Sequence, residues 1–125
     1  MTENDISYFI RAAIFKTYNG LGPGLLESIY EQVLLYELKR SGIHVKAQIA
    51  LPFQYESITF DLGFRLDLLV ENKVIIEIKS VENLHEVHHK QLLTYLKLTH
   101  LKLGILVNFN TADIKISIFR KVNNL

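Results

Sequence analysis

Three charged side chains interrupt the most apolar, strand-like stretch of the chain. Asp67 lies between leucines in "RLDLLV", and Glu77 and Lys79 alternate with isoleucines in "VIIEIKS". Residues two apart on a strand point to the same face, so the Glu77 and Lys79 side chains should converge. The simplest interpretation is a half-buried strand whose charges face water. The alternative is that the three residues form a reactive site.

The turn between the two strands decides whether Asp67 joins the other two residues. A three-residue loop, residues 71–73, pairs Asp67 directly opposite Glu77, whereas a two-residue loop places Asp67 on the other face of the sheet. Asn72 tolerates the left-handed backbone that either loop needs. In the first register two carboxylates and an ammonium group lie close together. Two such acids repel each other unless a cation lies between them, and hard oxygen ligands suit Mg²⁺ or Mn²⁺.

A third carboxylate, Glu27, lies at the start of a helical pattern in "GLLESIYEQVL". The helix dipole and the free N–H groups of a first turn favour a carboxylate there, so a capping role would explain it. Glu27 also shares a helical stripe with Tyr30, Leu34 and Leu38, the face that should meet the core. Its carboxylate could therefore project over the sheet instead.

Residues 85–89, "HEVHH", match the H-E-x-x-H signature of zinc proteases. The following residues, "KQLLTYL", supply no third zinc ligand of the metzincin type. We therefore favour the interpretation that these are polar residues at the start of a helix.

The elements that would position these residues can be read from the hydrophobic spacing. Apolar residues recur with helical spacing over residues 5–18, and "NGLGPG" ends that pattern. A second helix begins near Pro23 and ends near Gly42, after which the period changes to two. The pattern then predicts strands over 44–54, 58–70 (with a break near Gly63) and 73–81, a helix over 84–99, and strands near 103–109 and 114–121. The segment from 73–81 through the helix to 103–109 should form a parallel, right-handed βαβ crossover.

Composition limits the classes of protein to which the chain can belong. Its 125 residues, 49% hydrophobic and 22% charged, predict one globular domain over residues 1–125. The absence of cysteine excludes disulfides, thiolate zinc sites, cysteine nucleophiles and iron–sulfur clusters. We expect a cytoplasmic protein, because the N-terminus does not resemble a signal peptide and no apolar run approaches the ~18 residues of a membrane span. The net charge of +1 neither supports nor excludes a nucleic-acid partner, and a homodimer is compatible with the sequence.

Taken together, the motifs resemble those of the GxxExxY family. That family is similar in motif order to the PD-(D/E)XK nuclease superfamily, particularly to its RecB-like branch with a downstream Q-x-x-x-Y. The resemblance extends from about Ile6 to the C-terminus, and position 66 is Leu where the superfamily name has Pro. The residues that carry the resemblance are Gly24, Glu27 and Tyr30 of G-x-x-E-x-x-Y, then Asp67, Glu77 and Lys79, then Gln91 and Tyr95.

This resemblance implies a restriction-endonuclease-like α/β core, in which helices flank a mixed β-sheet with a βαβ crossover after the E-x-K strand. It also implies that Asp67 and Glu77 hold a divalent metal, Mg²⁺ or Mn²⁺. Lys79 would orient or activate the attacking water and stabilise charge on the phosphate, and Glu27 would complete the acidic site.

The same resemblance implies that Gln91, Tyr95 and Tyr30 contact the substrate. The activity we expect is metal-dependent hydrolysis of phosphodiester bonds in nucleic acid, with DNA as the favoured substrate. The alternative is a non-catalytic module that keeps the nuclease fold and binds nucleic acid or protein.

Overall fold

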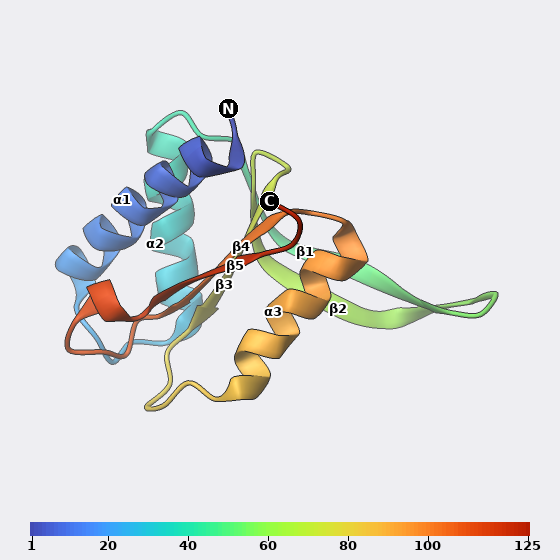
Figure 1. Ribbon diagram of the computed structural model, residues 1–125. Helices are drawn as coiled ribbons and strands as arrows, with labels where there is room; N and C mark the ends of the chain where they lie inside the picture. Colours follow the sequence, from blue (N-terminus) through green and yellow to red (C-terminus); the bar gives the residue numbers. More distant parts are fainter.

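The computed structural model describes the backbone of residues 1–125 and every side chain except those of Asp61 and Leu62. Five strands form one mixed sheet in the order β1-β2-β3-β4-β5, with helices on both faces (Figure 1). The helices are α1 (Glu3–Leu21), α2 (Glu27–Arg40) and α3 (Glu86–Thr99). The strands are β1 (Val45–Tyr55), β2 (Ile58–Val70), β3 (Val74–Lys79), β4 (Leu103–Asn108) and β5 (Ile118–Val122), and a 3₁₀ turn, η1, covers Ile114–Ile116. The predicted fold class is confirmed.

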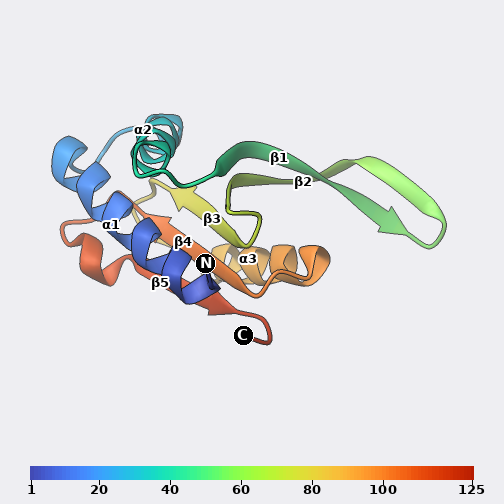
Figure 2. The ribbon, with the colours of Figure 1, turned by 90° about the horizontal axis from the view of Figure 1, so that it is seen from above.

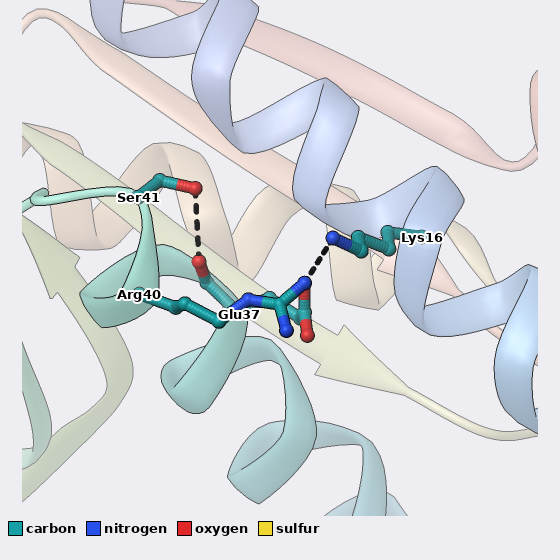
Figure 3. Close-up of polar contacts among 4 residues, drawn as sticks. All are labelled: Lys16, Glu37, Arg40 and Ser41. Atoms are coloured by element: carbon teal, nitrogen blue, oxygen red, sulfur yellow. Dashed lines mark hydrogen bonds and ion pairs between the residues drawn. The ribbon is translucent and has the colours of Figure 1, made fainter.

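Helices α1 and α2 pack side by side on one face of the sheet. A capping box starts α1, because the Thr2 side chain accepts a hydrogen bond from the Asp5 N–H and the Asp5 carboxylate accepts one from the Thr2 N–H. Near the end of α2, the Glu37 carboxylate forms ion pairs with Lys16 of α1 at 3.4 Å and with Arg40 at 3.5 Å (Figure 3). Helix α2 begins at Glu27, four residues later than the sequence predicted.

The predicted βαβ crossover is also present. Strands β3 and β4 run parallel and are joined through α3, whereas the other neighbouring strands are antiparallel. The predicted strand over 114–121 is wrong in its first half. There the Asp113 side chain accepts a hydrogen bond from the Lys115 N–H and stabilises η1, so that β5 begins only at Ile118.

The two faces of the sheet carry separate cores. Strand β4 is buried at all six positions because helices cover it on both sides. One core lies between the sheet and the α1–α2 pair and includes Ile10, Ile14, Leu34, Leu38, Leu68, Val70, Ile76 and Ile78. The other lies under α3 and includes Leu66, Ile75, Leu92, Tyr95, Leu96 and Leu106. None of the helices in the described part of the chain is long and apolar enough to cross a membrane.

The β1–β2 hairpin bends where it leaves the body of the protein. On an ordinary strand, alternate residues keep to one face. In this hairpin, the inward-facing residues on one side of the bend belong to the core under α1 and α2, and those on the other side belong to the core under α3. Val45, Ala47, Leu68 and Val70 belong to the α1–α2 side, whereas Ile49, Leu51, Phe64 and Leu66 belong to the α3 side. The change occurs at Gln48 of β1 and Asp67 of β2, after which the hairpin extends past α3 as a long ribbon (Figure 2).

A second irregularity lies farther along this hairpin, at the position where the sequence suggested a break. Strand β2 is continuous, but the β1–β2 register shifts between Leu51 and Phe53. Gly63 faces this shift so closely that a Cβ atom there would lie 1.7 Å from the Leu51 carbonyl oxygen. Gly63 is therefore needed for the approach of the two backbones and does not interrupt the strand.

Candidate active site

The loop between β2 and β3 has three residues, which is the first of the two alternatives that the sequence left open. Val70 pairs with Val74, and the Lys73 N–H donates to the Val70 carbonyl at 2.9 Å. Glu71 and Asn72 both adopt the left-handed backbone conformation, with φ of 52° and 55°. Extended by one pair, this register would set Asp67 opposite Glu77. A hydrogen bond from the Asp67 N–H to the Glu77 carboxylate joins the two residues, so the predicted juxtaposition of the two acids is confirmed.

The two strands separate where the acids meet. Regular pairing between β2 and β3 ends at Leu68 and Ile76. Beyond that point the Asp67 N–H donates to Glu77 Oε1 at 3.2 Å, and the Ile78 N–H donates to Asp67 Oδ2 at 2.8 Å. Carboxylate oxygens thus replace main-chain carbonyls as hydrogen-bond acceptors, and both acids are held between the diverging strands.

Burial strongly disfavours charge on this pair. Glu77 is only 5% exposed, and burial, followed by the nearby Asp67 carboxylate, raises the pKa of Glu77 to about 9. Burial also raises the pKa of Asp67, against the opposing effects of the Ile78 N–H and the Lys79 charge. Without a cation, Glu77 therefore retains its proton near neutral pH.

Glu27 projects over the sheet and does not cap its own helix. The N-cap of α2 is Leu26, which provides no side-chain cap, and Glu27 Oε2 instead accepts a hydrogen bond from the Ser80 N–H at 3.2 Å. Its charge contributes to raising the pKa of Asp67. Of the two roles that the sequence allowed for Glu27, the structure supports the one near the acid pair.

Tyr30 lies inside the protein, where it cannot contact substrate. It is 0% exposed and stacks on Phe109 at a centroid distance of 4.3 Å. Its hydroxyl donates to the Gly22 carbonyl at 2.5 Å and accepts from the Leu25 N–H at 3.1 Å. The predicted substrate-binding role therefore needs correction, because Tyr30 instead fixes the loop that leads into Glu27.

Helix α3 brings Tyr95 to the other side of the acids. Its ring packs edge-on against Phe64 at 5.3 Å. Burial, followed by the charges of Glu77 and Asp67, raises the pKa of Tyr95 to about 12. Gln91 lies one turn earlier on the same helix and is partly exposed.

The "HEVHH" histidines occupy the start of α3, as the sequence analysis favoured. His85 is the N-cap, and its N–H donates to Nδ1 of His88 at 3.1 Å, while His89 packs against the Phe119 ring at 5.0 Å. Burial, followed by the charge of Lys79, lowers the pKa of His88, and the charge of Glu27 opposes that shift. His88 was not among the predicted site residues, although its spacing of two helical turns from Tyr95 indicates that the two residues share a face of α3.

Two further polar groups near the site were also missed. Asn108, at the end of β4, accepts from the Val81 N–H at 3.0 Å and donates to the Val81 carbonyl at 2.9 Å, which fixes the chain just after Lys79. Glu31, one turn beyond Glu27, is 8% exposed, and its pKa is raised first by burial. The four-residue spacing from Glu27 was the only sequence signal for Glu31.

The donor set at the acid pair suits a hard divalent cation. Among the described side chains, no group of three or more His, Cys, Asp or Glu residues could hold a metal, so a metal at the acid pair would have Asp67 and Glu77 as ligands and few other side chains. Mg²⁺ commonly binds one or two carboxylates and completes its coordination with water and substrate phosphate. The buried Glu77 carboxylate and the half-buried Asp67 carboxylate, which resist joint ionisation, fit such an ion.

The divergent strands, the paired acids and the adjacent Lys79 define a restriction-endonuclease-like α/β protein. The family model of the PD-(D/E)XK nuclease superfamily matches residues 4–121. The chain therefore belongs to the PD-(D/E)XK nuclease superfamily. No curated protein and no solved structure gives a significant match.

Proposed function

We propose that the protein is a metal-dependent nuclease of the GxxExxY family, within the RecB-like branch, and that it hydrolyses phosphodiester bonds in DNA. The observation that carries this proposal is the Asp67–Glu77 pair, held across two diverging strands with Lys79 two residues beyond Glu77. Placing the half-buried Asp67 beside the buried Glu77 costs stability unless a cation compensates for them, so this arrangement supports a metal site.

Each residue has a distinct task in this proposal. Asp67 and Glu77 would hold Mg²⁺ or Mn²⁺, which when bound supplies positive charge to the scissile phosphate and lowers the pKa of water. Lys79 is half-buried on the same strand as Glu77, and its ammonium group donates to a phosphate oxygen and orients the attacking water. Glu27 accepts a hydrogen bond from the Ser80 N–H. Gln91, which is partly exposed, contacts the nucleic acid from α3. Tyr95 is only 4% exposed, so in place of the predicted substrate contact it supports the site from the core under α3.

The test measures metal binding and cleavage separately. Calorimetry with Mn²⁺ should show one site in the wild type, no binding for Asp67→Ala, and nearly unchanged binding for Lys79→Ala, because an ammonium group is not a ligand. Single-stranded, duplex and branched DNA should be cleaved only with metal present, and Lys79→Ala should be inactive through lost stabilisation of the transition state.

The same panel distinguishes the alternative of a binding module. RNA of the same forms is included, so that the preferred nucleic acid is measured directly. A binding module would bind nucleic acid without metal, would cleave none of these substrates, and would bind more tightly when Asp67 or Glu77 is neutralised. That combination of results would refute the nuclease proposal.

A further inference from the structure

The bend in the β1–β2 hairpin depends on a residue in an unfavourable backbone conformation. Gln48 has φ of 53°, in the middle of β1, where a residue with a Cβ atom rarely adopts left-handed geometry. The pairs Ala47–Leu68 and Ile49–Leu66 flank it, so Gln48 lies opposite Asp67. The surrounding structure must therefore impose this conformation at the point where Asp67 turns toward β3.

A hydrogen bond from α2 holds Gln48 in place. Its side-chain Nε2 donates to Glu31 Oε1 at 2.6 Å. Gln48 is otherwise exposed to solvent, whereas Glu31 is 8% exposed and lies one helical turn after Glu27. This bond therefore connects the bend in the hairpin to the helix that carries Glu27.

The bend determines where the Asp67 carboxylate lies. On a regular strand Leu66 and Leu68 would share one face and Asp67 would project from the opposite face. At the bend these leucines enter different cores, and the Asp67 carboxylate lies between β2 and β3, where it accepts the Ile78 N–H. Loss of the bend would withdraw Asp67 from Glu77.

We propose that Glu31 and Gln48 are positioning residues of this site: their hydrogen bond maintains the hairpin bend and so holds Asp67 against β3. Neither residue needs to touch substrate or metal. The consequence for metal binding rests on the proposed function, whereas the consequence for the position of Asp67 does not.

An isosteric exchange of the two side chains tests the hydrogen bond directly. Gln48→Glu places a second carboxylate against Glu31, and Mn²⁺ affinity should fall roughly tenfold or more, as for other residues that orient metal ligands. The double variant Glu31→Gln/Gln48→Glu restores an amide–carboxylate pair with reversed direction and should recover most of that affinity. Wild-type affinity in Gln48→Glu, or a double variant no better than the single one, would overturn the proposal.

Two smaller substitutions separate positioning from general stability. Gln48→Ala and Gln48→Gly remove the same amide, but glycine tolerates positive φ, so the glycine variant should be the more stable of the two. Both should bind Mn²⁺ more weakly than the wild type. Glu56→Gly is the matched control, because Glu56 also has a positive φ of 54° but lies in the turn that joins β1 to β2. If metal affinity merely followed thermal stability across these variants, the positioning role would be wrong.

Amide hydrogen exchange in the metal-free protein provides a readout that is independent of the proposed function. The Ile78 N–H should exchange faster in Gln48→Glu and return toward the wild-type rate in the double variant, because its acceptor is the Asp67 carboxylate. If the wild type binds no Mn²⁺ but Ile78 responds in this way, the metal site is wrong and the positioning role stands. An Ile78 amide that is indifferent to these substitutions would refute the positioning role.

Discussion

Asp67 and Glu77 accept the main-chain hydrogen bonds that a regular ladder would have given to carbonyl groups. The acids thus satisfy backbone groups as well as forming a candidate metal site. For this reason their removal affects local structure, and isosteric amides are more informative than alanine where stability is measured.

The raised pKa of Glu77 predicts that the metal-free protein loses stability as pH rises. Its ordinary pKa is 4.5, and its pKa in the folded state is about 9, so folding favours the protonated form. That contribution is fully present below pH 4.5 and is lost as pH rises toward 9. Between these values the free energy of unfolding should fall by about 1.4 kcal/mol per pH unit from this group. Urea unfolding at a series of pH values measures the slope.

The control for this pH dependence is Glu77→Gln, which keeps the shape of the side chain but cannot ionise. Its free energy of unfolding should depend less on pH across the same window. A slope equal to that of the wild type would show that another group causes the loss.

The sequence predicted the positions of Asp67 and Glu77 better than those of the residues around them. The placement of Asp67 and Glu77 around Asn72 allowed only two registers, and one of them was correct. Tyr30 was misassigned because helical spacing shows which side chains share a stripe but not which of them reach solvent. Glu31 and Gln48 are 17 residues apart, and no local pattern indicates that they meet.

Among the elements, the segment from Gly22 to α2 shows how a loop can position a carboxylate of the candidate site, here Glu27. The sequence predicted that α2 begins near Pro23, but the helix begins at Glu27. Gly22 and Gly24 adopt positive φ of 71° and 93°, which turns the chain before the helix starts. The hydroxyl of Tyr30, in the first turn of α2, then fixes this loop through its hydrogen bonds to the Gly22 carbonyl and the Leu25 N–H.

Removing that hydroxyl should loosen the loop without removing the aromatic ring. Tyr30→Phe leaves the Gly22 carbonyl and the Leu25 N–H without their partner, so the free energy of unfolding should fall by about 1–2 kcal/mol. The Ser80 amide, bound to Glu27, should also exchange faster with solvent. Urea unfolding and amide hydrogen exchange measure the two effects.

Tyr36→Phe is the matched control for Tyr30→Phe, because Tyr36 is on the same helix and is 58% exposed. It should leave both stability and the exchange of Ser80 nearly unchanged. Equal effects of the two substitutions would contradict the role of the Tyr30 hydroxyl.

For the whole molecule, the sequence predicted the order of elements and the parallel crossover, because these follow from hydrophobic period and from the length of the connection. It did not predict the change of core along β1 and β2. The residues involved alternate as on any half-buried strand, and only the positions of α2 and α3 decide which core each residue enters.

If the acid pair holds a metal, binding should stabilise the entire fold. At a free Mn²⁺ concentration about 100 times the dissociation constant, the free energy of unfolding should rise by about 2.7 kcal/mol. Thermal unfolding with and without Mn²⁺, and after addition of a chelator, measures this rise. Asp67→Ala should abolish it, whereas Glu37→Gln, on the far end of α2, should retain it. A rise of the same size in Asp67→Ala would mean that the ion binds elsewhere.

The three-residue loop between β2 and β3 also has a kinetic consequence. Asp67 and Glu77 are ten residues apart in the chain, so closing this hairpin has a low entropic cost and can occur early in folding. Glu27 and Asn108, which lie about 30 to 40 residues from the nearer of the two acids, must arrive later. We therefore expect the two carboxylates to meet while water still surrounds them, and to lose that water only when α2 and α3 close over the sheet. The late step of folding would then be the one that carries the electrostatic cost of the site.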